Sequence, residues 1–354
     1  MFTASTGWAQ RQSDGAVLRT TVGVSLWKIA SPSLGGDQVF AAAFIDADAA
    51  RILTAAAAVL QGEGSTTATV HTWATNNGGV TWVREGSFVG IPLPSPPGSL
   101  DFVNREDGWY TVTGLAAAGS SALFIYRTMD GGDRWSEVEQ TSFMATPRPF
   151  SIPLGCDKNQ ASFLDAHTGW VTAGCNSGSS FLYVTDDGGN SWRSQALGVK
   201  ASEYGYTTYP PQFVNGATGF MVGFIGNAPG PPATLFVTTN SGTTWTARPT
   251  PGYFPGASSF IDPDDGWISF SGDTQTTPAI QPGLWVTRNA GRTWSNLHPN
   301  ITLDGLSLDF VTAELGWAAT ATPTPTSDTP SSTGFVQTTD GGHTWTAVDA
   351  VISA

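Results

Sequence analysis

TTDGGHTW, residues 338–345, is the stretch that decides the fold, because variants of it recur along the chain. The variants are TNNGGVTW (75–82), TMDGGDRW (128–135), TDDGGNSW (185–192), TTNSGTTW (238–245), TRNAGRTW (287–294) and a divergent copy, TTVGVSLW (20–27). Copies that return roughly every 50 residues are typical of propellers, solenoids and arrays. The repeat therefore predicts one closed array rather than two or three separate domains.

The composition of these turns has a physical reason at each position. The third residue is always Asp or Asn outside the divergent copy, and its side-chain oxygen is expected to accept backbone N–H groups and close the turn. A glycine at the fifth position supplies a backbone angle that a side chain would obstruct. The final tryptophan is expected to bury its ring in the core rather than to bind a cofactor. These structural positions are Asn77, Asp130, Asp187, Asn240, Asn289 and Asp340, followed by Trp82, Trp135, Trp192, Trp245, Trp294 and Trp345.

Each repeat reads as four short strands, and the second strand begins at a Gly-Trp or Gly-Phe pair. Only the second repeat differs, with Ala50-Arg51-Ile52 at this place. The pattern predicts an all-β, seven-bladed β-propeller with four antiparallel strands per blade. The approximate blades are 1–35, 36–90, 98–142, 157–197, 208–250, 254–298 and 303–350. The first blade has little room for an innermost strand, so either the tail 348–354 lies near that position or upstream residues supply the strand.

The turn also occurs together with a preceding Phe-x-x-x-x-x-Gly-Trp element, at 163–170, 260–267 and 310–317. This combination resembles the Asp-box, or BNR, repeat, and most closely the seven-bladed propellers of the photosystem II assembly and stability factor family and their bacterial relatives outside photosynthesis. The resemblance covers essentially the whole chain. It implies a propeller that acts by binding without catalysis, although Asp boxes also occur in sialidases, xyloglucanases and sorting receptors.

Composition excludes several classes of function. The net charge is −13 and only 12% of residues are charged, so the field of the protein repels nucleic acids and anionic lipid surfaces. The four histidines fall in different repeats and the cysteines lack metal-ligand spacing, so we expect no metal site and no cofactor. No apolar run is long enough to span a bilayer, and no signal segment precedes the first repeat. A lysine-poor, Thr/Ser/Ala/Gly-rich composition favours an extracellular or cell-envelope protein, and we expect a monomer.

The long connections between strands two and three and between repeats are expected to share one face, where binding sites usually lie. Aromatic residues gather on two of these loops and are the best binding candidates from sequence, by stacking on sugars or receiving a partner protein. The alternative is that they pack the loops onto the blade tops. These candidates are Tyr204, Tyr206, Tyr209, Tyr253 and Phe254.

The two cysteines, Cys156 and Cys175, flank the first two strands of the fourth repeat. An antiparallel pair would bring them to the same end of the blade, so the sequence allows a disulfide, in agreement with export, or two buried free thiols. No catalytic residue can be named. A glycosidase needs two carboxylates about 5–10 Å apart, and nothing in the sequence pairs such residues.

The sequence therefore favours a non-catalytic binding or scaffold propeller whose loop face receives a protein or a carbohydrate. The alternative is a secreted glycoside hydrolase built on the same propeller, which would need two facing carboxylates in a deep cleft.

Overall fold

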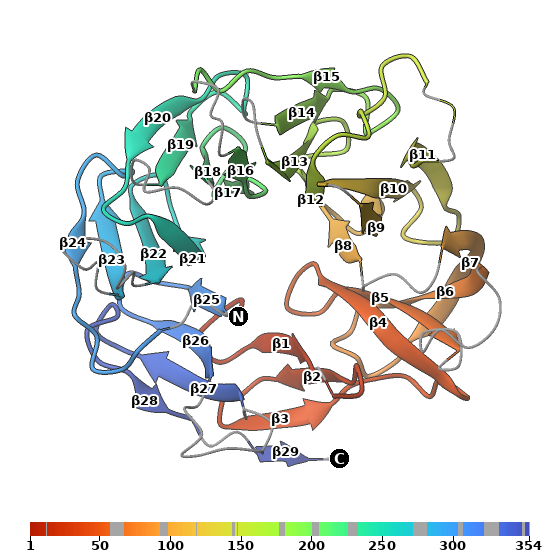
Figure 1. Ribbon diagram of the computed structural model, residues 1–354. Coiled ribbons are helices and arrows are strands. Elements are labelled where there is room, and N and C mark those ends of the chain that lie inside the picture. Colours follow the sequence, from red (N-terminus) through yellow and green to blue (C-terminus); the bar gives the residue numbers. More distant parts are fainter. Residues whose placement is uncertain are drawn as a thin grey trace.

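A computed structural model shows sheets arranged in a ring around a central axis (Figure 1). The structure describes residues 1–11, 13–56, 67–92, 98–117, 119–143, 146, 148–176, 181–199, 205–225, 233–271, 282–303, 307–321, 333–348 and 351–353. Every regular element in these ranges is a β-strand, as the short apolar segments between glycine-rich turns predicted. In the four-stranded sheets, the first strand lies nearest the axis and the later strands follow outward in sequence order (Figure 1).

The strands form five four-stranded sheets and one nine-stranded sheet within the described residues. The first sheet contains β1 (Gly7–Gln10), β2 (Val17–Thr20), β3 (Leu26–Ile29) and β29 (Val351–Ser353). The next two contain β4 (Asp37–Phe44), β5 (Ala50–Ala56), β6 (Thr67–Thr75) and β7 (Val83–Pro92), then β8 (Ser99–Phe102), β9 (Gly108–Ala117), β10 (Ser120–Thr128) and β11 (Ser136–Thr141). The last two contain β21 (Phe254–Phe260), β22 (Asp265–Ser271), β23 (Gly283–Arg288) and β24 (Ser295–Asn296), then β25 (Ser307–Phe310), β26 (Gly316–Ala321), β27 (Thr333–Thr338) and β28 (Thr346–Ala347).

The nine-stranded sheet corrects the prediction of seven separate four-stranded sheets. It contains β12 (Asp157–Phe163), β13 (Gly169–Cys175), β14 (Phe181–Thr185), β15 (Arg193–Ser194), β16 (Tyr206–Thr208), β17 (Gln212–Phe213), β18 (Gly219–Phe224), β19 (Thr234–Thr238) and β20 (Thr246–Pro249). The physical reason is β16, which pairs with β13 on one side and with β18 on the other. The connection between the fourth and fifth repeats thus forms a strand, β16, which joins these two repeats into one sheet.

The repeated turns are closed as the sequence predicted, by the Asp or Asn at the third position. In the last turn, Asp340 Oδ1 accepts the Thr344 N–H at 2.9 Å, and the Thr338 hydroxyl accepts the Gly342 N–H at 2.9 Å. The same two bonds recur in the other five turns that keep the acceptor. Gly342 has φ 104°, a left-handed conformation that glycine adopts at little cost.

An Asp340→Ala variant is expected to lose about 1 kcal/mol of unfolding free energy, whereas Asp340→Asn should stay close to the parent near neutral pH, because asparagine does the same work in three other turns. The hydrogen bond from the Thr344 side chain, with that from its backbone, lowers the pKa of Asp340 to about 2. Its ionised form therefore stabilises the fold fully above the unfolded pKa near 4, and this contribution is lost as pH falls through about 2. Urea denaturation between pH 2 and 7 measures the unfolding free energy of the parent and both variants. A loss of unfolding free energy in acid that is as large in Asp340→Asn as in the parent would contradict the role given to the ionised carboxylate.

At several seams, adjacent sheets are held together by an aromatic ring at the start of a second strand, stacked on the inner-strand phenylalanine of the next sheet. Trp109 lies 3.7 Å from Phe163 and Trp267 lies 3.8 Å from Phe310, centroid to centroid, with nearly parallel planes. Both indole N–H groups also donate to the fourth residue of the next sheet's turn, the first at 2.9 Å to Gly188 O and the second at 2.9 Å to its counterpart. Each of these two tryptophans therefore joins two neighbouring sheets by a ring stack and a hydrogen bond.

Arg51 takes the place of this tryptophan in the second repeat. Its guanidinium lies over the Phe102 ring, 5.9 Å from the centroid, and its Nε donates to Gly131 O at 3.1 Å. Both partners are the counterparts of those that the tryptophans use. A cation–π contact thus replaces the aromatic stack at this seam, and the side chain is 4% exposed.

The tail closes the ring on its outer side. β29 pairs in parallel with β3, with Ile352 opposite Trp27, so the C-terminal strand lies at the outer edge of the first sheet (Figure 1). The suggestion that residues 348–354 lie near the innermost position is therefore wrong. β1 itself is the inner edge of this sheet.

Candidate binding site

Most of the predicted loop face lies outside the described residues, and Tyr204 is among the residues that are not described. Of the other aromatic candidates, Tyr206 lies in β16 with 3% of its surface exposed and packs edge-on against Phe236. Tyr206 thus follows the alternative that the sequence left open, in which the aromatic residues pack against the blades, because pairing of β16 on both sides draws its ring into the core. Tyr209 is 38% exposed and stacks on Phe224 at 6.0 Å.

The two remaining candidates lie at the start of the next sheet. Tyr253 is half-buried directly before β21, and Phe254 begins that strand, although its side chain lies outside what the structure describes. Among the described side chains, Tyr206 is buried, Tyr209 is exposed and Tyr253 is half-buried. The aromatic site remains a prediction for the part of the loop face that is not described.

Some neighbouring inner strands are joined around the axis by a similar hydrogen bond. At two of these seams, the side chain that precedes an inner-strand phenylalanine accepts a backbone N–H from the next inner strand along the ring. Phe163 N donates to Asp101 Oδ2 at 3.1 Å, and Phe310 N donates to Ser259 Oγ at 2.9 Å. At the next step, Asp309 Oδ2 accepts from the amino group of Met1. Met1 therefore takes the place of a phenylalanine at this one seam.

The side chain of Met1 agrees with this equivalence. A Cβ on Gly7 would lie 2.0 Å from Met1 Sδ, just as a Cβ on Gly169 would lie 2.3 Å from a ring carbon of Phe163. Because a flexible thioether replaces an aromatic ring here, Trp317 has no phenylalanine in the next sheet to stack on. Its Nε1, in a side chain 1% exposed, has no hydrogen-bond partner among the described residues.

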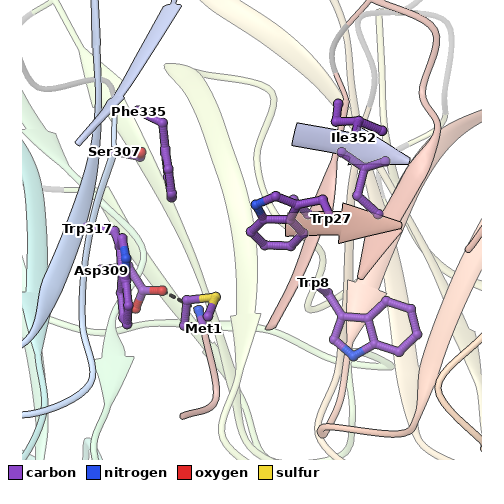
Figure 2. Close-up of a pocket in the computed structure, with 10 residues that line it drawn as sticks. Met1, Trp8, Trp27, Ser307, Asp309, Trp317, Phe335 and Ile352 are labelled. Atoms are coloured by element: carbon purple, nitrogen blue, oxygen red, sulfur yellow. Dashed lines mark hydrogen bonds and ion pairs between the residues drawn. The ribbon is translucent and has the colours of Figure 1, made fainter. Parts of the chain in front are cut away.

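A cavity of about 290 Å³ lies at this same seam, between the β1–β3 sheet and the β25–β28 sheet. Figure 2 shows Trp317, Phe335 and Asp309 on one side, and Trp8, Trp27 and Ile352 on the other. Ala9 and Leu18 complete the apolar wall of the first sheet. The lining is mostly apolar, and its one carboxylate is Asp309, which is bonded to Met1. We call this space the seam cavity.

Two carboxyl groups have raised pKa values, and burial is the main cause in both. Asp101 lies in β8 and accepts the Phe163 N–H, while Glu139 lies in β11, 3% exposed, with Thr141 Oγ1 at 2.9 Å. These strands are the opposite edges of one sheet, ordered β11-β10-β9-β8. Three strand spacings separate them by about 14 Å. That exceeds the separation of a glycosidase pair, about 5–9.5 Å, so the two carboxyl groups do not form one.

His71 and Asp37 form a polar network within the sheet of β4–β7. The distance from His71 Nδ1 to Asp37 Oδ2 is 2.7 Å, and the Thr54 hydroxyl donates to the same carboxylate oxygen at 3.1 Å. Trp73 Nε1 in turn donates to Thr54 Oγ1 at 3.2 Å. The carboxylate fixes the orientation of the imidazole, and the chain of bonds satisfies the polar groups of three strands.

Lys158 is a buried cation beside the cysteines, 5% exposed. Its ammonium group donates to the carbonyl oxygens of Ser121 (3.0 Å), Gly155 (2.8 Å), Cys156 (3.2 Å) and Leu154. Burial lowers the pKa of Lys158 to about 8. The carbonyl cage keeps the charge satisfied near neutral pH, but the fold holds this proton less tightly than the unfolded chain does.

The unfolding free energy is therefore expected to rise as pH increases from about 8, because the unfolded lysine, with a pKa near 10.4, still binds a proton that the folded one releases. Chemical denaturation between pH 7.5 and 9.5 measures this slope below the titration of the tyrosines. Lys158→Met should abolish the rise, while the exposed Lys28→Met should keep it. A rise of equal size in Lys158→Met would contradict the assignment.

The described part of the chain contains no cluster of three His, Cys, Asp or Glu side chains placed to hold a metal ion. Nor does it contain a helix that is both long and apolar enough to cross a membrane.

Cys156 and Cys175 are joined by a disulfide, with their Cα atoms 4.6 Å apart. Sequence reasoning missed Met1 and Arg51, although both stand at repeat positions that an alignment of the seven copies would have shown.

Comparison with known proteins places the chain in a structural class. No protein-family model matches it, and no curated protein matches it in sequence. Solved structures do match over nearly the whole chain. The GH74 enzyme of Niastella koreensis is 14% identical with a TM-score of 0.52, and the match covers 98% of this chain and 67% of that one. The chain is therefore a β-propeller.

Two further structures are similar at lower scores. YCF48 bound to D1 peptide is 17% identical with a TM-score of 0.48, covering 88% of this chain and 82% of that one. An α-L-arabinofuranosidase from Fusarium graminearum, in complex with an iminosugar inhibitor, is 12% identical with a TM-score of 0.45, covering 79% and 87%. All three structures are less than 25% identical to this chain, so the comparisons carry no conclusion about its function.

Proposed function

We propose that this chain is a non-catalytic binding propeller. The observation that carries the proposal is the seam cavity, an apolar hollow walled by Trp8, Trp27, Trp317 and Phe335 beside a strand edge that pairs with no other described strand. Apolar hollows with a few polar groups are typical of binding sites. The carboxyl groups with raised pKa values are instead about 14 Å apart and are engaged in hydrogen bonds within the fold.

The propeller is proposed to contain seven Asp-box repeats, with the nine-stranded sheet holding two of them. In support, the turns after β14 and β19 carry the same bonds: Ser191 N donates to Asp187 Oδ1, and Thr244 N donates to Asn240 Oδ1. Among the described residues, strand pairing joins the two units only through the short strand β16. We also propose the seven blade ranges that the sequence predicts.

An extracellular or cell-envelope location is proposed for the chain. The Cys156–Cys175 disulfide supports it, because such bonds persist in oxidising compartments. The net charge of −13 favours neutral or basic protein partners, or carbohydrates, over nucleic acids. A monomeric state is part of the same proposal.

The test sets binding against hydrolysis on one sample of the whole chain. Arrays of immobilised peptides and oligosaccharides measure binding, and a reducing-sugar assay with plant and bacterial polysaccharides measures hydrolysis. We expect saturable binding without released sugar. Sugar release that falls in Asp101→Asn or Glu139→Gln would overturn the proposal in favour of a glycoside hydrolase.

A further inference from the structure

We propose that an apolar groove between β3 and the turn of the second repeat binds a segment of a partner protein that presents large aliphatic side chains and one carboxylate. The groove has a volume of about 410 Å³ and shares no lining residue with the seam cavity. The inference goes beyond the proposed function, because it names a second surface and the chemistry of its partner. We call this space the turn groove, and its lining includes Val22, Leu26, Lys28, Ile29, Ala30 and Val80.

The turn of the second repeat, residues 75–82, packs directly on the end of β3. Trp82 Nε1 donates to Ala30 O at 2.6 Å, and a Cβ on Gly79 would lie 2.8 Å from the Cβ of Ala30. Only a residue without a side chain lets the turn approach so closely. The floor of the turn groove is therefore built by contacts of the fold itself and does not need a ligand to form.

Two valines at the turn groove are exposed, although the same repeat positions are polar elsewhere. Val80 is 79% exposed, more than any other large apolar side chain that the structure describes, and Val22 is 63% exposed. The counterparts of Val22 are the Asp or Asn residues that close the other six turns. The counterparts of Val80 are Ser25, Asp133, Asn190, Thr243, Arg292 and His343. An apolar side chain that stays exposed contributes little to the core, so neither valine is explained by folding.

These two departures from the repeat border the same space. Val22 lies in the turn 20–27 and Val80 in the turn 75–82, and both line the turn groove. Ile29, exposed at the end of β3, and the half-buried Leu26 complete its apolar surface. Apolar residues scattered singly are normal on a protein surface, whereas several that line one groove form a patch of the kind that binds proteins.

The turn groove carries positive charge, although the protein as a whole is acidic. Lys28 in β3 stands directly opposite Arg19 in β2, so two like charges share one face of the sheet. Arg19 Nη2 is paired with Asp48 Oδ1 at 2.9 Å. Lys28 is exposed and forms no ion pair among the described residues. No Asp or Glu stands among the described residues that line the groove, so a partner's carboxylate would meet an unpaired ammonium group.

These features favour a protein segment over other ligands. Val22 and Val80 project at the surface and can be covered only from outside, whereas small molecules are usually held in clefts that enclose most of their surface. The net charge of −13 repels nucleic acids and anionic lipid surfaces, so a single carboxylate is favoured over a strongly acidic partner. We therefore commit to an apolar segment of another protein that carries one Asp or Glu.

The experiment selects peptides from a phage library of short random sequences on immobilised residues 1–354, and then measures one selected peptide by fluorescence polarisation. We expect the selected peptides to share Leu, Ile or Val together with one Asp or Glu. Val22→Asp and Val80→Asp introduce residues that other repeats carry at these positions, so both variants should fold as the parent does. Each should weaken binding about tenfold or more, because burial of an unpaired carboxylate is costly.

The matched control is Met129→Asp. Met129 is exposed in the turn of the third repeat, away from the turn groove, and the fourth repeat has Asp186 at this position. The variant should bind the selected peptide as the parent does.

A reversal of charge tests the role of Lys28 in a way that unfolding cannot imitate. Lys28→Glu should lose the selected peptide and bind a version in which lysine replaces the acidic residue of the peptide. Arg134→Glu changes an exposed charge in the turn of the third repeat and should leave the preference as it is in the parent.

Equal binding by the parent and Val80→Asp would overturn the inference, as would a selection that yields no peptide dependent on the turn groove. Concentration-dependent dimers that Val80→Asp abolishes would make the occupant a second copy and overturn the commitment to a different protein. Oligosaccharide binding that Val80→Asp abolishes would overturn it in favour of a carbohydrate. If peptides or oligosaccharides on the arrays bind equally to all of these variants, the propeller remains a binding protein and only the turn groove is wrong.

Discussion

Replacement of Trp267 by alanine is expected to lower the free energy of unfolding by about 3–5 kcal/mol, the usual cost of deleting a large buried aromatic side chain. Trp267 is fully buried, stacks on Phe310 at 3.8 Å, and donates to Gly341 O at 2.9 Å. The guanidinium of Arg288 lies 4.7 Å from its ring centroid. One substitution therefore removes packing, a hydrogen bond and a cation–π contact from the same seam. Urea denaturation followed by circular dichroism measures the loss.

The control for this prediction is Trp267→Phe, which keeps a ring over Phe310 and removes the N–H bond. It should cost less than the alanine variant, in line with a single buried hydrogen bond of about 1 kcal/mol and the smaller ring. If the unfolding free energy of the alanine variant falls by less than about 1 kcal/mol, the seam is held mainly by its strands rather than by the contacts of Trp267.

The sequence predicted the parts of the fold that depend on local chemistry. Asp340 and its equivalents close their turns through bonds within one short segment, so the same residues produce the same geometry wherever they occur. The buried ring of Trp267 could be predicted for a similar reason, because it recurs at a fixed distance from that turn. Such features need only a repeat to be recognised.

The features that the sequence did not predict depend on contacts between distant segments. Arg51 looked like a lost aromatic position, yet its stem and guanidinium reach both of the partners that a tryptophan uses. Tyr206 looked like a surface residue in a loop rich in tyrosine and proline, yet two short pairings bury it. Neither result follows from composition, because each depends on what the neighbouring sheet presents.

The candidate site was predicted less well than the fold. The aromatic loops drew attention to one face, whereas the seam cavity arises where Met1 stands in place of a phenylalanine and Ala9 in place of a larger residue. These are single departures from the repeat, and their effect appears only when two sheets are brought together around the ring.

Loss of the Cys156–Cys175 disulfide is expected to lower the unfolding free energy by about 3 kcal/mol. The bond closes a loop with a sequence separation of 19 residues, and the chain-entropy model assigns about 3 kcal/mol to a loop of this size. Denaturation of the same protein with and without a reductant measures the effect without any substitution. A thiol count of zero after denaturation in the absence of reductant confirms the starting state.

The double variant Cys156→Ala/Cys175→Ala should lose as much as reduction does, and reductant should then have no further effect. Local contacts predict where the fold would loosen first. Cys156 O accepts the Ser121 N–H at 3.1 Å and the Lys158 ammonium at 3.2 Å, so the bond anchors the carbonyl cage of that lysine. Hydrogen exchange at Ser121 and Lys158 should accelerate before exchange in the distant β25–β28 sheet does. Uniform acceleration across the ring would show that the disulfide acts on the unfolded chain alone.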